Sequence, residues 1–250
     1  MKTSFKEKLK KKDLLIGTIL SLPSPEIAEI ITNAGFDWIF VDAEHGTFDI
    51  NGIQKILQVA DDNCPCIVRA PGISKIWIKK LLDTGIQGII FPLVNTEEEA
   101  REIVNLCKYP PDGTRSIGIG RAHKYGMKFN EYISSANKDI SIILQIEHKE
   151  AVKNFESIIS VPGIDGIFIG PYDLSGSLGK IGQVNDPEVQ DNISFVKNTC
   201  DKAGMPVGIF GADAKAVKPF IKEGYTLITI GLDVMFLGKT LGSLIEEVKS

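Results

Sequence analysis

Short, mostly apolar runs recur along the whole chain and are separated by longer amphipathic stretches. Runs of this length and composition are typical of parallel strands that are buried on both faces. We expect eight such strands, at Leu14–Leu20, Asp37–Asp42, Pro65–Ala70, Gly88–Phe91, Ser141–Glu147, Gly166–Gly170, Pro206–Phe210 and Leu227–Gly231.

The stretches between these runs carry apolar residues three and four positions apart, which predicts amphipathic helices. A glycine follows several of them, just before the next apolar run, as is common at helix C-termini. The predicted helices are Ser24–Asn33, Asn51–Ala60, Ile73–Leu82, Thr96–Cys107, Glu150–Ser160, Pro187–Ala203, Ala212–Glu223 and Asp233–Val248.

Eight alternating strand and helix units predict an α/β fold with a parallel sheet and right-handed crossovers. Eight strands close naturally into a (β/α)₈ TIM barrel, and 250 residues suit one such domain spanning 1–250. An open, doubly wound sheet is the alternative, but no GxGxxG sequence opens a helix after the first strand.

Composition narrows the class of protein. The net charge of -4 and the pI of about 5.5 argue against nucleic acid or an anionic membrane as partner. Six lysines crowd the first twelve residues, so we expect segment 1–13 to be a solvated, basic, amphipathic piece below the barrel. It has no apolar core typical of a secretory signal, and no stretch is long enough to span a membrane.

The remaining bulk features point to a reduced, intracellular setting. The four cysteines have no spacing typical of a redox or zinc motif, and we expect them to be buried thiols: Cys64, Cys66, Cys107 and Cys200. We therefore predict a cytoplasmic protein. One connection, 109–128, is unusually long and rich in Gly, Arg and Pro. Because it comes after the fourth strand, we expect it to start at the catalytic face, as an active-site or interface loop.

Polar side chains gather where the predicted strands end, which in a TIM barrel is the catalytic face. Glu147 ends the fifth strand and Asp173 follows the sixth. Two carboxylates from consecutive strand ends suit a hard divalent cation with open positions, Mg²⁺ or Mn²⁺, and Co²⁺ would also fit. His45 as a third ligand would favour Zn²⁺ instead, and a salt bridge from Glu147 to Arg69 is the alternative without metal.

Two further groups near this face carry acid–base and electrostatic chemistry. Asp42 and His45 flank a tight turn, and a nearby carboxylate would fix the tautomer of His45 and make it a general base; a histidine that only caps the turn is the alternative. Arg69 is the one basic residue within the predicted strands. Its burial requires an anion, either a substrate carboxylate or enolate, or Asp42 or Glu147. No strand contains a lysine, which excludes a Schiff-base aldolase of this architecture.

These motifs resemble those of the HpcH/HpaI aldolase family: Asp42–Ala43–Glu44–His45–Gly46, Arg69, Gln145–Ile146–Glu147 and the block from Val161 to Ser175. The resemblance implies a class II pyruvate aldolase that cleaves 4-hydroxy-2-oxo acids into pyruvate and an aldehyde. It further implies that Glu147 and Asp173 hold the metal and that His45, supported by Asp42, is the acid/base group.

The resemblance also implies a substrate site and an assembly. Arg69 and Gln145 would contact the pyruvate part, beside Gly170, Pro171 and Tyr172. Tyr172 stands where many relatives have a small residue, and would either shorten the aldehyde pocket or bind a substrate hydroxyl. Asp83 resembles a family carboxylate that contacts the region of the catalytic histidine from a neighbouring subunit. Family members form homo-oligomers, commonly hexamers built as trimers of dimers. The dimers swap the C-terminal helix, which in this chain would begin at Asp233.

Three other functions share some of these features. A lyase similar to citrate lyase β or malyl-CoA lyase would use the same metal enolate on a CoA thioester, although no long insertion for CoA is evident. A non-catalytic barrel that binds a small acid, and a metal-dependent hydrolase, are the other two; the intact set of His45, Arg69, Glu147 and Asp173 argues against the former.

Overall fold

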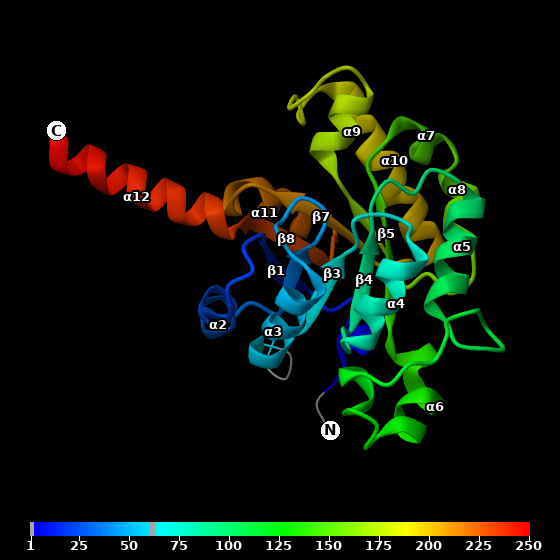
Figure 1. The fold of residues 1–250 in the computed structure, drawn as a ribbon. Coiled ribbons are helices and arrows are strands. Elements are labelled where there is room, and N and C mark those ends of the chain that lie inside the picture. Colours follow the sequence, from blue (N-terminus) through cyan, green and yellow to red (C-terminus); the bar gives the residue numbers. More distant parts are fainter. Residues whose placement is uncertain (1–2, 61–63) are drawn as a thin grey trace.

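The computed structural model describes residues 3–60 and 64–250, and its core is a closed barrel of eight parallel strands in sequential order (Figure 1). Every strand pairs with its neighbours in the chain, and β1 closes the barrel against β8. This confirms the TIM barrel and rules out the open sheet. The strands are Leu15–Leu20 (β1), Trp38–Asp42 (β2), Cys66–Arg69 (β3), Gly88–Phe91 (β4), Ser141–Ile146 (β5), Gly166–Ile169 (β6), Val207–Gly211 (β7) and Leu227–Leu232 (β8).

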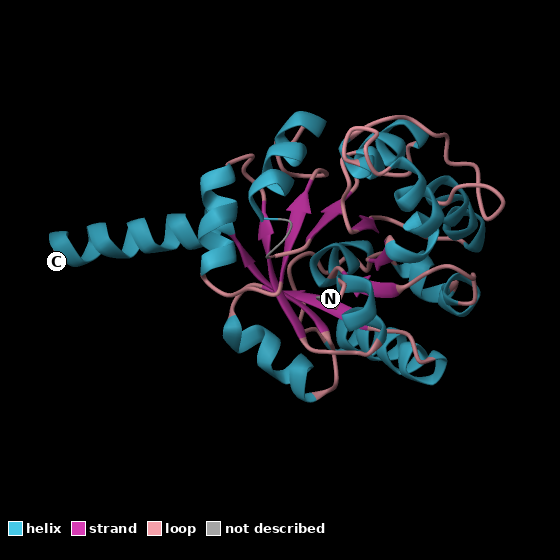
Figure 2. Cartoon of the chain, turned by 90° about the horizontal axis from the view of Figure 1, so that it is seen from below, coloured by secondary structure: helices cyan, strands magenta, loops and turns pink. Residues whose placement is uncertain are grey.

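Helices cover the barrel where the amphipathic pattern predicts them (Figure 2). They are α2 (Pro25–Asn33), α3 (Ile50–Ala60), α4 (Lys75–Asp83), α5 (Glu97–Cys107), α7 (Lys149–Lys153), α8 (Phe155–Ile159), α10 (Pro187–Ala203), α11 (Ala214–Lys222) and α12 (Asp233–Lys249). The predicted helix at Glu150–Ser160 is in fact two, because the backbone at Asn154 (φ -94°, ψ 9°) leaves the helical region. Four short elements were not predicted: α1 (Phe5–Lys10), a 3₁₀ turn η1 (Arg121–His123), α6 (Phe129–Asp139) and α9 (Pro171–Ser177).

Helix α1 closes the N-terminal end of the barrel, and the expectation of a solvated segment is wrong for it. Phe5 and Leu9 are buried in the inner barrel cluster, and the ring of Phe5 lies 6.0 Å from that of Trp38. The ammonium group of Lys6 donates to Asp165 at 2.8 Å, and both side chains are only 7% exposed. The segment is basic, but one of its charges is paired beneath the barrel; Lys2 lies outside the described residues.

Segment 109–128 begins after α5, not directly after β4, and this corrects its expected location. Helix α5 returns the chain to the N-terminal end of the barrel, so the segment and α6 lie opposite the catalytic face (Figure 1). It is fixed to α4 by an ion pair of 3.0 Å between Arg115 and Asp83. Within one subunit the segment cannot line the catalytic face, and only its predicted role as an interface loop remains.

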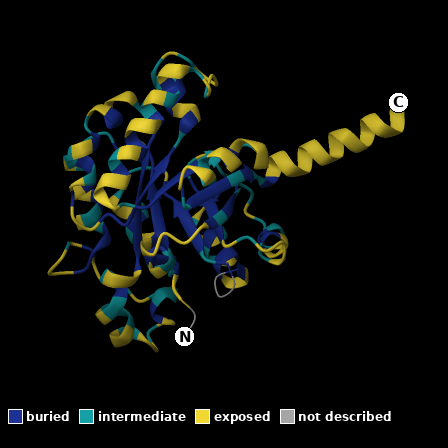
Figure 3. Cartoon of the chain, turned by 180° about the vertical axis from the view of Figure 1, so that it is seen from behind, coloured by how far each residue is buried: buried dark blue, intermediate teal, exposed yellow. Residues whose placement is uncertain are grey.

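Helix α12 projects away from the barrel and is exposed from Val234 onward (Figures 1 and 3). Its exposed side chains include many large apolar ones: Val234, Met235, Phe236, Leu237, Leu241, Leu244, Ile245 and Val248. Among the described residues, no helix combines the length and apolar character needed to cross a bilayer. The four cysteines are buried thiols, as expected.

Candidate active site

Asp42 and Arg69 form a buried pair at the carboxyl ends of β2 and β3. These two residues are aligned across the neighbouring strands, and Arg69 donates through Nε (2.9 Å) and Nη2 (2.7 Å) to the two oxygens of Asp42. The paired geometry is the strong, bidentate form of this interaction. Burial alone would raise the pKa of Asp42, but the hydrogen bonds and charge of Arg69 outweigh it, and the pKa is lowered. Of the alternatives left open for Arg69, the pairing with Asp42 is observed.

Asp42 holds the turn after β2, but the imidazole of His45 in this turn lies near a different carboxylate. Asp42 Oδ1 accepts the main-chain N–H groups of Glu44 (3.1 Å) and His45 (3.3 Å). The carboxylate near the ring of His45 is Glu44, with Oε2 at 3.7 Å from Nε2. The imidazole therefore lies near Glu44 and not in the expected contact with Asp42, whose two oxygens accept hydrogen bonds from Arg69. The side chain of His45 is 68% exposed and lies at the rim of the cavity.

Glu147 is a deeply buried carboxylate with two protein donors. It is 3% exposed, its Oε1 accepts the N–H of Leu93 at 2.8 Å, and its Oε2 accepts a hydrogen bond from Gln145 Nε2. Leu93, whose N–H makes this contact, adopts a positive φ of 53°, which a leucine rarely does. Burial, together with the nearby charges of Asp173 and Glu44, raises the pKa of Glu147 to about 7, although its two hydrogen bonds act the other way.

Gly170 is required by close packing against Glu147. A Cβ at this position would lie 2.7 Å from Glu147 Oε2, 2.9 Å from Glu147 Cβ and 3.3 Å from Gln145 Nε2. Its φ of -96° is accessible to any residue, so the constraint is space and not backbone conformation. Gly170 therefore leaves room for the carboxylate at the end of β5.

Asp173 reaches the same region from the first turn of α9, where Pro171 opens the helix after β6. The two carboxylates thus come from consecutive strand ends, as predicted, one buried and one exposed. A small cavity of about 150 Å³ lies between the strand ends, lined by Ile19, Phe40, His45, Arg69, Gln145, Phe168, Gly170, Pro171, Tyr172, Asp173 and Phe210. Seven of the expected site residues therefore line one cavity, which Glu147 and Asp42 support from behind.

The donor set fits a hard divalent cation. Carboxylate oxygens are its preferred ligands, and a cation would relieve the mutual repulsion that contributes to the raised pKa of Glu147. Gln145 Oε1, buried at the cavity, finds no hydrogen-bond partner among the described residues. A group of three or more acidic, cysteine or histidine side chains suited to a metal is not found in residues 3–60 and 64–250.

Two contributors to the site escaped the sequence analysis. Glu44 lies within the motif at 42–46, and its Oε2 is 3.2 Å from Arg69 Nε. The pattern of apolar residues along a strand does not reveal which side chain of the following turn will contact the next strand. Leu93 acts through its main chain, for which a leucine gives no signal. Asp83, in contrast, is bound to Arg115 at the opposite end of this chain's barrel, so any role in catalysis would require a second copy.

Comparison with known proteins agrees with the site. Residues 16–239 match the model of the HpcH/HpaI aldolase/citrate lyase family. The chain is 36% identical to a hydroxypyruvate/pyruvate aldolase of Roseobacter denitrificans, covering 98% of this chain and 97% of that protein. It is 35% identical to a 2-keto-3-deoxy-L-rhamnonate aldolase of Salmonella typhi, covering 98% and 93%. A crystal structure of an HpcH/HpaI aldolase/citrate lyase family protein from Burkholderia cenocepacia superposes with a TM-score of 0.95 at 33% identity, covering 99% and 100% of the two chains.

Proposed function

The chain belongs to the HpcH/HpaI aldolase/citrate lyase family, and on this premise we propose that it cleaves a 4-hydroxy-2-oxo acid into pyruvate and an aldehyde with the help of a divalent metal ion. The observation that carries the proposal is the cavity at the strand ends, which is lined by the carboxylate of Asp173, the buried guanidinium of Arg69 and the buried amide of Gln145. The carboxylate of Glu147 lies behind it, hydrogen-bonded to Gln145. Such a set suits a small, oxygen-rich anion and has no lysine for imine chemistry.

Glu147 and Asp173 would hold the metal, and Mg²⁺ or Mn²⁺ suits these oxygen donors best. A bound cation of this kind supplies Lewis-acid polarisation of a keto acid. The surrounding chain contributes rigidity, because Leu93 and Gln145 fix both oxygens of Glu147, and hydrogen-bonded carboxylates of this kind orient metal ligands.

Arg69 would stabilise negative charge on the pyruvate half of the substrate. Its side chain is about nine-tenths buried, held by Asp42 and Glu44, and stacked over the ring of Phe40 at 5.2 Å. A guanidinium fixed in this way adds positive charge where the oxygen of an enolate develops, without reorganising during the reaction. The unpartnered oxygen of Gln145 would accept a hydrogen bond from substrate or bound water.

His45 would move the proton of the substrate's C4 hydroxyl, directly or through water. It is the histidine that lines the cavity, with the carboxylate of Glu44 at 3.7 Å from its Nε2, and a histidine so placed can act as a general base.

The test is pyruvate release from a panel of 4-hydroxy-2-oxo acids, before and after EDTA and after readdition of Mn²⁺. We expect cleavage of at least one acid, its loss with EDTA and its return with metal. His45→Ala should lower cleavage by roughly 10²–10⁴-fold while Mn²⁺ still binds, and Lys215→Ala, outside the inner cavity, is the matched control. Cleavage that survives complete metal removal, or a His45→Ala variant as active as wild type, would refute the mechanism.

We also propose that the protein assembles through α12 as a homo-oligomer. The helix exposes many more large apolar side chains than the single, scattered ones that are normal on a protein surface. It also projects away from its own barrel (Figure 3). A second copy of the chain would bury them. Leu241→Glu with Ile245→Glu should therefore lower the mass measured by light scattering, whereas Lys239→Glu should not; an unchanged mass in the first variant would contradict the proposal.

A further inference from the structure

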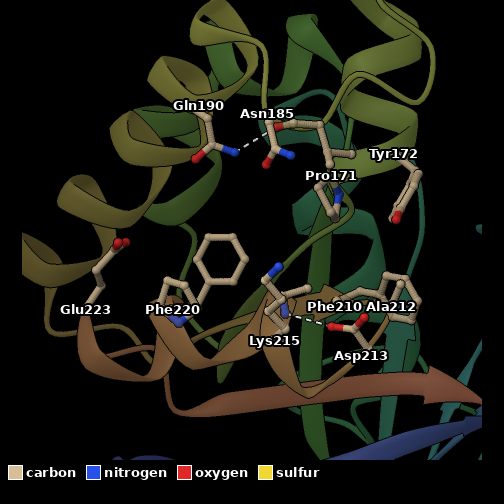
Figure 4. A pocket seen from close by; sticks show the side chains of 14 residues that line it. Pro171, Tyr172, Asn185, Gln190, Phe210, Ala212, Asp213, Lys215, Phe220 and Glu223 are labelled. Atoms are coloured by element: carbon tan, nitrogen blue, oxygen red, sulfur yellow. Dashed lines mark hydrogen bonds between the residues drawn. The ribbon is translucent and has the colours of Figure 1, made fainter.

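A second, larger cavity adjoins the catalytic one. It measures about 500 Å³ and lies between α9, the start of α10 and α11, beyond the end of β7 (Figure 4). The inner and outer cavities have three lining residues in common, Pro171, Tyr172 and Phe210. These residues form the partition between the two spaces.

The partition consists of two aromatic rings in edge contact. The centroids of Tyr172 and Phe210 are 5.9 Å apart and their planes meet at 62°. Phe210 packs against the inner barrel cluster and is anchored there. Tyr172 is 42% exposed, so its ring is the less constrained half of the pair.

Only the side chain of Tyr172 is free to adjust, because its main chain is fixed. The hydroxyl of Ser175, which is fully buried, donates to Tyr172 O at 2.6 Å. The same hydroxyl oxygen accepts the N–H of Gly182 at 3.0 Å, which ties the connection after α9 to the first helical turn. The main chain that carries the ring is therefore held by α9 and does not lie in a loose loop.

The two cavities differ in what they accommodate. The inner one, at about 150 Å³, is half the lower limit of about 300 Å³ that is usual for pockets of drug-sized ligands. It must hold pyruvate and the aldehyde carbon together. The outer one has an apolar wall that includes Pro219 and Phe220, and Lys215 extends its amino group into it (Figure 4). Removing the partition would join this space to the reaction centre.

We infer that the Tyr172–Phe210 pair is a size filter that restricts the aldehyde half of the substrate to short chains. The inference rests on the proposed function and adds the substrate class: the 4-hydroxy-2-oxo acids that fit are those derived from small aldehydes, such as glycolaldehyde, whereas long or branched aldehydes meet the tyrosine ring.

The experiment compares condensation of pyruvate with glycolaldehyde and with hexanal, in the presence of Mn²⁺. We expect wild type to prefer glycolaldehyde. Tyr172→Ala should raise the ratio of kcat/KM for hexanal over glycolaldehyde at least about tenfold, since each methylene group that gains a place in an apolar pocket contributes about 10-fold or more. Tyr172→Phe keeps the ring, and its ratio should stay close to that of wild type. Phe210→Leu opens the partition from the other side and should shift the ratio in the same direction as Tyr172→Ala.

Exchange of the pyruvate methyl protons in D₂O, followed by NMR, separates the two hypotheses because it needs the enolate but no aldehyde. If wild type exchanges and the ratio is unchanged in both Tyr172→Ala and Phe210→Leu, the size filter is refuted and the proposed function stands. A shift in Tyr172→Phe as large as in Tyr172→Ala would also refute it, since the hydroxyl and not the ring would then select. If wild type neither exchanges nor condenses, the proposed function fails, and the filter with it.

Discussion

Replacing Gly170 by alanine tests whether the end of β6 leaves space for the carboxylate at the end of β5. The added Cβ would lie 2.7 Å from Glu147 Oε2, which is well inside van der Waals contact. Glu147 cannot simply rotate away, because Leu93 and Gln145 hold its two oxygens. The carboxylate must therefore shift and weaken at least one of these hydrogen bonds.

The expected cost follows from this overpacking. Extra atoms in a packed interior destabilise by about 1–3 kcal/mol, which for a chain of this size lowers the Tm by roughly 2–12 °C. A shift of about 1 Å in a group that positions the reaction lowers the rate by about 10²-fold. Disturbing the support of a metal ligand weakens metal affinity by about 10–100-fold.

The matched control is Gly166→Ala at the start of β6, where a Cβ would meet Leu9, Pro206 and Ile143 at ordinary distances of 3.5–3.7 Å. Thermal unfolding, calorimetric titration with Mn²⁺ and pyruvate release are measured on both variants. We expect Gly170→Ala to lose stability, metal affinity and activity, and Gly166→Ala to retain the last two. If Gly170→Ala binds Mn²⁺ as tightly as wild type, the assignment of Glu147 as a crowded metal ligand is wrong.

Substitutions at three further positions probe the pairs that support the site and the barrel. Asp42 has a pKa below its ordinary value of about 3.9, because the hydrogen bonds and charge of Arg69 outweigh burial. Ionised Asp42 therefore stabilises the fold above that pH, and this stabilisation is lost as the pH falls through the lowered pKa. In urea unfolding from pH 6 to 3, the free energy of unfolding should fall more steeply for wild type than for Asp42→Asn, and parallel curves would contradict this. Lys6→Met leaves Asp165 buried without its cation and should lower the free energy of unfolding by about 3–5 kcal/mol. The kcat at 20 °C should be unchanged, and a loss of kcat at a temperature where the variant is folded would refute a purely structural role of the pair. Leu93→Gly keeps the N–H that Glu147 accepts and tolerates the positive φ, so its activity should stay near wild type. Leu93→Pro removes that N–H and cannot adopt the positive φ, so it should lower Mn²⁺ affinity. Equal affinity in the two variants would show that neither the contact nor the backbone conformation at this residue matters.

The strands and most helices could be predicted because each has a local pattern of apolar residues in the sequence. A buried parallel strand is apolar on both faces, and a helix on its surface repeats every 3.6 residues, so the segments around Val41, Ile143 and Ile209 are evident from neighbours in the sequence. The short helices α1 and α9 were missed, since six or seven residues are too few to establish a period. The long connection was placed at the wrong end because α5 reverses the chain before it begins.

The residue types of the candidate site were determined by the sequence alone: carboxylates, a histidine and an arginine at the ends of successive apolar runs, with motifs that identify the family. Which of them touch was decided only by the tertiary structure. Arg69 binds Asp42, and the imidazole of His45 lies near Glu44 instead. Glu147 accepts the N–H of Leu93 from 54 residues away. The physical reason is that side-chain pairing depends on strand register and on space across the barrel mouth, and neither is encoded in the identity of one residue or its neighbours.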